Sequence, residues 1–400
     1  MKPIVRLALF LILTVVIPAL APRAVADGAL AKQDLDALLK ATDDIAAKVS
    51  QLRGLPIKKP VDRGVMGKAE VLRRIVLRLG EEYSESELGE EGRALVRLGL
   101  LPEGTDYKQL VLDLLTEQIG GFYDPKEKKL YIADWIDTWM QGPVMAHEIG
   151  HALQDQSFDL DTFMKPVKQN SDEQVARQAL VEGDGFALML QYTFREQGYT
   201  FDPWGNPNLV DVMKKTVEAG GLGGEAMGQL QKAPLVLREQ LLFPYLAGFK
   251  LMAETLRHHP WRRIDAMFKK PPLSTEQVLH PDKYFAGEKP VVIRPAVLTV
   301  FRGWTAAYRN VLGELGWSIF LRQHGIADER AITAAAGWGG DRLVIYAPPG
   351  DDGKSVGDLV VVGLSSWDEE VDAIETFGAA ADALLVLAAV KEQTERTAPY

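Results

Sequence analysis

The stretch MAHEIGHALQDQ, residues 145–156, constrains the fold of this 400-residue chain more than any other part of its sequence. On an α-helix, residues four apart share one face, so His147 and His151 lie one turn apart with Glu148 beside them. The apolar residues fall on the other side of the same helix: Met145, Ala146, Ile149, Ala152 and Leu153. The sequence therefore predicts a helix that packs along one side and directs two imidazoles and a carboxylate into a cleft.

Two imidazoles at this spacing can bind one zinc ion at roughly 2.0–2.1 Å, and the adjacent Glu148 carboxylate can accept a proton from a water molecule there. This is the H-E-x-x-H arrangement of zinc peptidases. Catalytic zinc usually keeps three protein ligands and one open position. A third histidine six residues after His151 is excluded, because Ser157 occupies that place. The third ligand is therefore expected farther along the chain.

A second long helix is predicted from Ser171 to the residue before Gly198. Ser171 and Gln174 fit a capping box, and glycine is typical just after a last helical turn. Gly183 and Gly185 lie inside this helix, where each costs about 1 kcal/mol relative to alanine. Glycine at such positions indicates that another part of the molecule approaches the backbone closely.

Three acidic residues of this second helix are candidates for the third ligand. Glu182 lies in register with apolar residues, where an ionisable group is rarely buried without a partner. Glu173 lies in the first turn, where the helix dipole already accounts for an acid. This favours Glu182, with Asp184 and Glu173 as alternatives. Asp184 or Asp155 would then either orient a ligating imidazole or form a surface salt bridge.

The first 26 residues have the pattern of a secretory signal peptide. Lys2 and Arg6 precede the apolar run LALFLILTVVIPALA, and the small residues AVA at 24–26 form a cleavage site. The run is shorter than the roughly 20 apolar residues of a membrane-spanning helix. We therefore expect a secreted or periplasmic protein with no stable membrane anchor after cleavage.

The charge of the mature chain excludes some partners. Cleavage after residue 26 moves the formal charge from -10 to -13, because Lys2, Arg6 and Arg23 leave and no acidic residue does. An acidic chain without a basic block gives no electrostatic case for binding nucleic acid or an anionic membrane. The sequence contains no cysteine, so an exported fold must be held together by its core and any metal ion.

Hydrophobic periodicity predicts a mainly helical α+β fold for the rest of the chain. The arms around the turn DPKEKK, the second of them LYIAD at 130–134, predict a β-hairpin, and Gly142 with Pro143 opens the motif helix. The strands DRLVIYAP and GDLVVVGLSSW predict a C-terminal hairpin, and the apolar run 383–390 predicts the buried face of a last helix. Further helices are predicted at 29–53, 68–79, 235–257, 310–323 and from 368 onward.

These elements suggest four regions: a signal peptide (1–26), an N-terminal helical region (27–110), a catalytic region (111–290) and a C-terminal α/β region (291–400). The sequence leaves open whether the N-terminal region is part of the mature domain or an inhibitory pro-segment.

The motif and the later glutamate resemble the gluzincin branch of the zincin metallopeptidases. More closely, the chain is similar to a group of little-characterised exported bacterial metallopeptidases. The resemblance implies a zincin-like fold, zinc bound by His147, His151 and Glu182, and Glu148 as general base. It also implies a small sheet beside the active-site helix whose edge strand pairs with an extended peptide, and LYIAD is the candidate edge. The matching strings, between about residues 50 and 345, are GFYDPKEKKLYI, HEIGHALQDQ, ALVEGDG, FPYLAG, STEQVLHPDKY and GWGGDR.

The expected activity is hydrolysis of a peptide or protein substrate. Zinc would polarise the scissile carbonyl, and Glu148 would transfer a proton from water to the leaving amine. A further donor should stabilise the oxyanion. His280, in a loop, is the best candidate for this catalytic role, although stabilisation of a turn before Pro281 explains its ring equally well. Tyr245 is a weaker candidate, because an aromatic residue in LLFPYLAGF is usually part of the core.

A rival hypothesis is a non-catalytic, zinc-stabilised peptidase-like fold that binds peptides or envelope proteins. Intact Glu148 favours the enzyme, because a purely structural zinc site does not need a base. Metal-dependent hydrolysis of a non-peptide bond is a third hypothesis, which the motif alone does not separate from the first.

Overall fold

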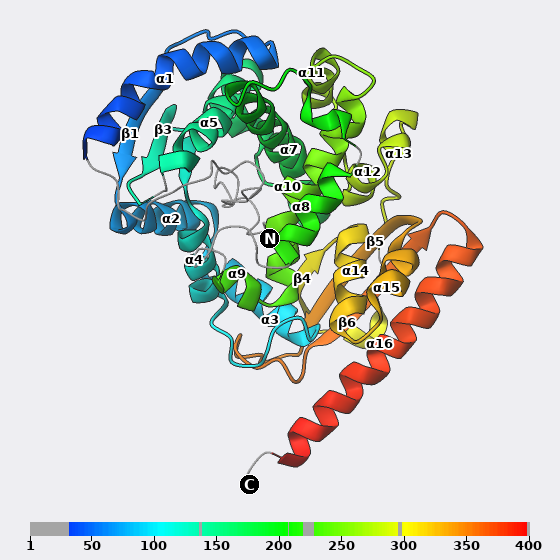
Figure 1. Cartoon of the computed structure of the whole chain (residues 1–400). Coiled ribbons are helices and arrows are strands. Elements are labelled where there is room, and N and C mark those ends of the chain that lie inside the picture. Colours follow the sequence, from blue (N-terminus) through cyan, green and yellow to red (C-terminus); the bar gives the residue numbers. More distant parts are fainter. Residues whose placement is uncertain (1–31, 136–137, 207, 219–227, 295–297, 398–400) are drawn as a thin grey trace.

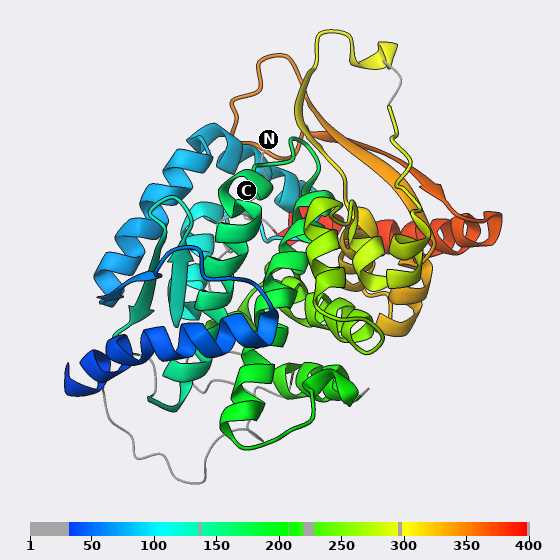
Figure 2. The same ribbon diagram turned by 90° about the horizontal axis from the view of Figure 1, so that it is seen from above.

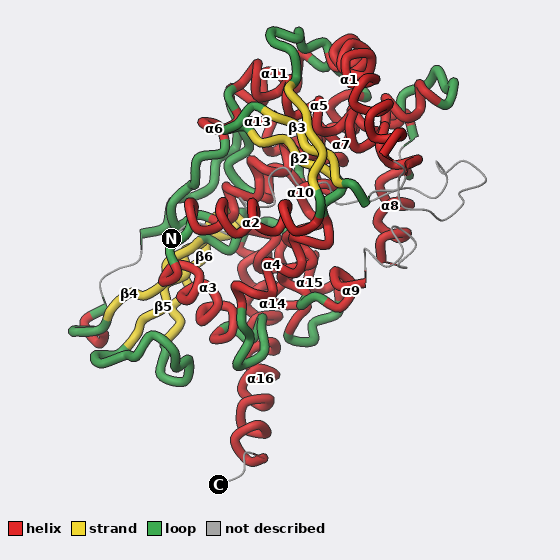
Figure 3. Tube along the Cα trace, turned by 90° about the vertical axis from the view of Figure 1, so that its left-hand side faces the viewer, coloured by secondary structure: helices red, strands yellow, loops and turns green. Residues whose placement is uncertain are grey.

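The computed structural model describes residues 32–135, 138–206, 208–218, 228–294 and 298–397. These residues form a mainly helical α+β fold with two three-stranded sheets, which lie apart from each other in Figure 3. The predicted α+β class is thus confirmed. The predicted signal peptide, residues 1–26, lies outside the described residues. Within the described ranges, no helix is long and apolar enough to cross a membrane.

The first sheet has the strand order β1-β3-β2 and packs against the motif helix. β2 (Gly121–Asp124) and β3 (Lys129–Ala133) form the predicted hairpin, whereas β1 (Asp62–Met66) pairs in parallel with β3. β3 is therefore the central strand, and the prediction that LYIAD forms an edge is wrong. The reason is that β1, a short segment with too little alternation to be predicted, occupies that side of β3.

The motif helix is α5 (Thr138–Phe158), and α7 (Ser171–Glu196) packs between it and α10 (Leu235–Leu256) (Figure 1). Two glycines allow α7 and α10 to cross closely. A Cβ on Gly183 would lie 2.4 Å from the carbonyl carbon of Gly248, and a Cβ on Gly248 would lie 2.2 Å from a backbone oxygen of α7. Real Cβ atoms do not approach backbone this closely, so one of the two predicted close approaches is this helix crossing.

The predicted start of the motif helix is wrong by a few residues, whereas α7 begins at Ser171 as predicted but has a different cap. α5 already includes Thr138, so Pro143 lies within the helix and does not open it. The N-cap of α7 is Asn170, whose side chain accepts a hydrogen bond from the N–H of Glu173 at 3.1 Å. Ser171 is not the cap because its hydroxyl donates to a backbone oxygen of the C-terminal region. Asparagine and serine are comparable caps, so sequence alone did not separate them.

Helix α1 (Lys32–Arg53) lies across α5, α7 and β1, as the dark blue helix in Figure 2 shows. Its buried residues Ile45, Ala46 and Val49 join one hydrophobic core with the first sheet and α5. The other helices are α2 (Lys68–Glu82), α3 (Glu85–Arg97), α4 (Tyr107–Gln118), α6 (Leu160–Phe163), α8 (Leu209–Glu218), α9 (Gly228–Lys232), α11 (Arg262–Lys269), α12 (Thr275–Leu279), α13 (Pro281–Ala286), α14 (Gly313–Gln323), α15 (Asp328–Ala335) and α16 (Glu370–Thr397), with short 3-10 turns at Pro203–Gly205 and Thr299–Phe301.

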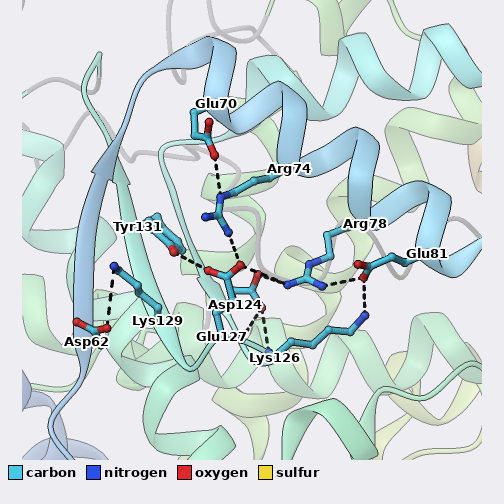
Figure 4. A network of polar contacts seen from close by, with 10 residues as sticks. All are labelled: Asp62, Glu70, Arg74, Arg78, Glu81, Asp124, Lys126, Glu127, Lys129 and Tyr131. Atoms are coloured by element: carbon cyan, nitrogen blue, oxygen red, sulfur yellow. Dashed lines mark hydrogen bonds and ion pairs between the residues drawn. The ribbon is translucent and has the colours of Figure 1, made fainter.

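A network of charged side chains fastens the hairpin to α2 (Figure 4). Arg74 donates to Glu127 at 2.7 Å, and Arg78 donates to Asp124 at 2.6 Å. Glu127 also accepts a hydrogen bond from the Tyr131 hydroxyl at 2.6 Å. These contacts hold the turn between β2 and β3 against α2.

The second sheet is antiparallel with the order β4-β5-β6, formed by β4 (Thr305–Asn310), β5 (Trp338–Ala347) and β6 (Val360–Trp367). The predicted C-terminal hairpin is β5 and β6, and β4 was missed. The last helix, α16, extends away from the body in Figure 1. Its run 383–390 was predicted to be buried, but of its described residues only Ala383 is buried and Leu387 half-buried, whereas Leu384 and Leu385 are 54% and 70% exposed. Because every residue of the run is apolar, the sequence did not indicate which side of the helix packs against the body.

Candidate metal centre

The motif helix and α7 bring three ligand atoms to one point. The Nε2 atom of His147 lies 3.2 Å from Oε2 of Glu182, and Nε2 of His151 lies 3.4 Å from the same oxygen. All three side chains are fully buried, and one ligand atom from each lies within 4.8 Å of the others. The structure therefore brings together the two histidines and the glutamate that the sequence singled out.

The dimensions of this group fit a tetrahedral zinc ion. Two ligands bound at roughly 2.0–2.1 Å in tetrahedral geometry are about 3.3 Å apart, which agrees with the two distances to Glu182. The other carboxylate oxygen, Oε1 of Glu182, has no hydrogen-bond partner among the described residues. Two imidazoles and one carboxylate are also a common ligand set of catalytic zinc.

Gly185 makes room for this group. A Cβ at this position would lie 3.1 Å from Cε1 of His147 and 3.1 Å from Cε1 of His151. The second predicted close approach to α7 is therefore that of the two imidazoles. A larger residue would push at least one ring away from Glu182.

Glu148 is fully buried next to the three candidate ligands. Burial raises the pKa of its carboxyl group to about 8, with the His151 charge acting in the opposite direction and Glu182 adding to the rise. The nearby backbone of Tyr123 on β2 also acts to lower this pKa. Neither carboxylate oxygen of Glu148 has a hydrogen-bond partner among the described residues.

The pKa values of the two imidazoles are shifted in opposite directions. Burial, with help from the charge of His151, lowers the pKa of His147 to about 4. Burial also acts to lower the pKa of His151, but the charge and hydrogen bond of Glu182 outweigh it and raise this pKa to about 9. Because a ligating imidazole must be neutral, a metal ion would compete with the proton that Glu182 favours on His151.

Gln154 holds the outer nitrogen of His151, and the sequence did not predict this contact. Oε1 of Gln154 lies 2.8 Å from Nδ1 of His151, and its Nε2 donates to Oδ2 of Asp184 at 2.8 Å. Asp184 is therefore not a ligand, and it reaches the imidazole only through Gln154. The available signal was the spacing of three residues from His151, which places Gln154 on the same helix face.

The other acidic candidates lie elsewhere. Asp155 accepts hydrogen bonds from the Tyr123 hydroxyl at 2.7 Å and from Nζ of Lys128 at 2.8 Å, so it follows the salt-bridge interpretation and orients no imidazole. Glu173 forms an ion pair with Arg177 at 2.6 Å in the first turns of α7.

A second group of converging carboxylates, formed by Glu276, Glu288 and Asp368, surrounds Nζ of Lys283. That group already contains a cation from the protein, so it does not compete as a metal site.

The two candidates for the oxyanion donor differ in position. The ring of Tyr245, on α10, stacks beside that of His147 with a centroid distance of 6.3 Å and an interplanar angle of 29°. His280 lies between α12 and α13, and its Nε2 is 2.9 Å from Oε1 of Glu314 on α14. Tyr245, the weaker candidate from sequence, therefore lies beside the candidate ligands, whereas His280, the stronger one, is paired with Glu314.

Comparisons with known proteins add one match. A family model described as a domain of unknown function (DUF8575) matches residues 300–399. That segment contains the second sheet with α14, α15 and α16, and none of the candidate metal ligands. No curated protein and no solved structure matches the chain.

Proposed function

We propose that this protein is an exported zinc-dependent metallopeptidase of the zincin type, which hydrolyses peptide bonds. The observation that carries the proposal is the convergence of His147, His151 and Glu182 at distances suited to zinc, with Glu148 buried beside them. The position of α5 next to a small sheet supports the zincin-like fold. The signal-peptide pattern supports export.

Each residue has a distinct role in the proposed reaction. His147, His151 and Glu182 would hold the zinc ion, which when bound lowers the pKa of water and polarises the scissile carbonyl. Glu148 accepts a proton as the water oxygen bonds to the carbonyl carbon. It then delivers the proton to the nitrogen of the leaving amine as the C–N bond breaks. The stacked Tyr245 is the proposed donor to the oxyanion.

Strand β2 is the proposed partner for an extended substrate. Among the described strands it pairs only with β3, and the backbone of Tyr123 lies near enough to Glu148 to lower the pKa of that carboxyl group. A peptide that adds to this edge would pass its carbonyl groups beside Glu148. This assignment replaces LYIAD, which is the central strand.

Elemental analysis and a cleavage assay together test the proposal. We expect near-stoichiometric zinc in the wild-type protein and in Glu148→Gln, and much less in Glu182→Ala. Cleavage of a peptide library should fall about 10²- to 10⁴-fold in Glu148→Gln, because the proton acceptor is lost. Equal zinc in all three proteins would contradict the ligand assignment. Bound zinc with unchanged cleavage in Glu148→Gln would contradict the base, and zinc without any cleavage would favour the peptide-binding hypothesis.

A further inference from the structure

We infer that Arg53, the last residue of the N-terminal helix α1, is a positioning residue that orients His151 through Asp184 and Gln154. The inference rests on the proposed zinc site. Helix α1 would then supply a residue that positions a zinc ligand, although no residue of α1 is in the zinc motif.

Gln154 determines which nitrogen of the His151 ring carries the hydrogen. Its Nε2 donates to Asp184 at 2.8 Å and to the carbonyl oxygen of Val181 at 3.2 Å, and both of these atoms are acceptors. The other end of the amide, Oε1, must then face Nδ1 of His151, at 2.8 Å. In the neutral ring Nδ1 therefore carries the hydrogen, and the lone pair of Nε2 is directed toward Glu182 and an ion beside it.

Arg53 holds the carboxylate that fixes this amide. Its Nε donates to Oδ1 of Asp184 at 2.7 Å and its Nη2 donates to Oδ2 at 3.1 Å. Asp184 is fully buried and Arg53 is 1% exposed. A buried carboxylate is costly without a cation, and the guanidinium fork fixes both of its oxygens at once. Oδ2 is thereby held toward Gln154.

The guanidinium is itself anchored on two further sides. Nη1 of Arg53 donates to Asp265 on α11 at 2.8 Å, and its Cζ lies 4.7 Å from the ring centre of Trp261. These contacts leave the guanidinium little freedom to turn. The chain of contacts from His151 to Asp265 therefore consists of side chains that are each held in one orientation.

Loss of this orientation should weaken zinc binding. Removal of an outer partner of a metal ligand typically costs 10- to 100-fold in metal affinity. We expect this loss in Arg53→Met. Arg53→Lys should lose less, because it keeps the positive charge beside Asp184, but it should still lose some affinity, because an ammonium group cannot contact both carboxylate oxygens as the guanidinium does. Arg53→Met leaves the buried charge of Asp184 without a cation, which could by itself destabilise the protein. The double variant Arg53→Met/Asp184→Asn removes the negative charge as well. It should also bind zinc more weakly.

Two substitutions in α1 serve as controls. Lys48 forms another ion pair between α1 and α7, with Glu196 at 2.8 Å, but both side chains are largely exposed. Lys48→Met therefore breaks a link between the same helices without touching the chain to His151. Val49 of α1 is fully buried in the core shared with the first sheet and α5. Val49→Ala should therefore lower stability without altering any of the polar contacts.

The experiment measures zinc affinity by competition with a chelator, the visible spectrum of the cobalt-substituted protein, and the Tm of the metal-free protein. Lys48→Met and Val49→Ala should keep the wild-type affinity and spectrum. Arg53→Met should bind zinc about 10- to 100-fold more weakly, and Arg53→Lys should lose less affinity. Both should show a changed cobalt spectrum, which Val49→Ala should not show even if it lowers the Tm as much.

Three outcomes would contradict parts of this account in different ways. Wild-type affinity and spectrum in the Arg53→Lys variant and the double variant would reduce Arg53 to a structural role and overturn the inference alone. The same weakening in Lys48→Met would also overturn it, since any α1–α7 contact would then suffice. Absence of metal from the wild-type protein, even after zinc is supplied, would overturn the proposed function itself.

Discussion

Three buried carboxylates lie on helix α7, and two of them have contrasting surroundings: Asp172 in its first turn and Glu182 in its middle. Asp172 accepts hydrogen bonds from the backbone N–H of Thr275 at 3.1 and 3.2 Å and from the hydroxyl of the same residue. Glu182 faces two imidazole nitrogens, and its Oε1 has no hydrogen-bond partner among the described residues. Both oxygens of Asp172 receive donors from the protein, whereas only Oε2 of Glu182 has polar neighbours, the two imidazoles.

A neighbouring acid reinforces the contrast. Asp341 on β5 accepts from the N–H groups of Leu312 and Gly313, each at 2.9 Å, and from the indole N–H of Trp338 at 2.8 Å. Buried polar groups are nearly always hydrogen-bonded, and a group that departs from this rule needs an explanation. The junction around Asp172 and Asp341 is explained as structure, because α7, α12, α14 and β5 meet there. The proposed zinc ion would account for the centre at Glu182, because the three ligand atoms would share it.

The largest expected effect is a loss of stability from a substitution in the junction that leaves the zinc ligands untouched. A Cβ on Gly313 would lie 1.7 Å from Oδ1 of Asp172, and Gly313 has a φ of +71°. Gly313→Ala should therefore lower the free energy of unfolding by about 3 kcal/mol or more, measured by urea denaturation. Gly353→Ala is the matched control, because its φ is also +71° but nothing lies within 4 Å of the added Cβ. Loss of zinc from folded Gly313→Ala protein would show that the two regions are not independent.

The centre was largely predictable from sequence because its geometry is local to helices. Helical register alone placed His147 and His151 on one face, and an ionisable residue in an apolar stripe identified Glu182. The glycine positions were also informative, since Gly183 and Gly185 both face a close neighbour.

Contacts between distant segments could not be predicted in this way. Arg53 meets Asp184 across 131 positions of sequence, and no periodicity reports such a pair. Strand β1 was missed for the same reason, and with it the central place of β3. Tyr245 was undervalued because it lies in an apolar stretch: it is indeed buried, yet its ring stacks beside His147.

The next effect concerns that tyrosine and sharpens the functional side of the comparison. Tyr245→Phe keeps the ring beside His147 and removes only the hydroxyl. If the hydroxyl stabilises the oxyanion, kcat should fall about 10²- to 10³-fold while zinc content stays unchanged. Tyr192→Phe, another buried tyrosine near the site helices, is the control and should keep full activity. Equal activity in both variants would leave Tyr245 as a core residue.

A smaller effect is expected at Gly185, where a substitution should weaken zinc binding without lowering the stability of the metal-free protein. Gly185→Ala gains up to about 1 kcal/mol of helix propensity but places a methyl group 3.1 Å from both imidazoles. Zinc affinity should fall by about 10-fold or more as a ring shifts, whereas metal-free stability should hold. Gly80→Ala in α2 adds a methyl group with nothing within 4 Å and should leave zinc affinity unchanged. Unaltered affinity in Gly185→Ala would mean that the rings are not confined by α7.

The smallest effect tests whether His280 belongs to the junction. The hydrogen bond to Glu314 raises the pKa of His280, opposed by burial and by Lys283 and aided by the charges of Glu314 and Glu276. A raised pKa gives stability that is present below the unfolded value of about 6.5 and is lost as the pH rises through the folded value.

His280→Gln should therefore destabilise the protein more at about pH 5 than at about pH 9, by less than about 1 kcal/mol because the pair is partly exposed. Urea denaturation at both pH values measures the difference. Cleavage activity is the second readout, since a positional link to Glu314 predicts little change in kcat. If kcat falls about 100-fold while the pH dependence of stability is that of the wild type, His280 acts on the substrate after all, and the division between junction and centre fails at this residue.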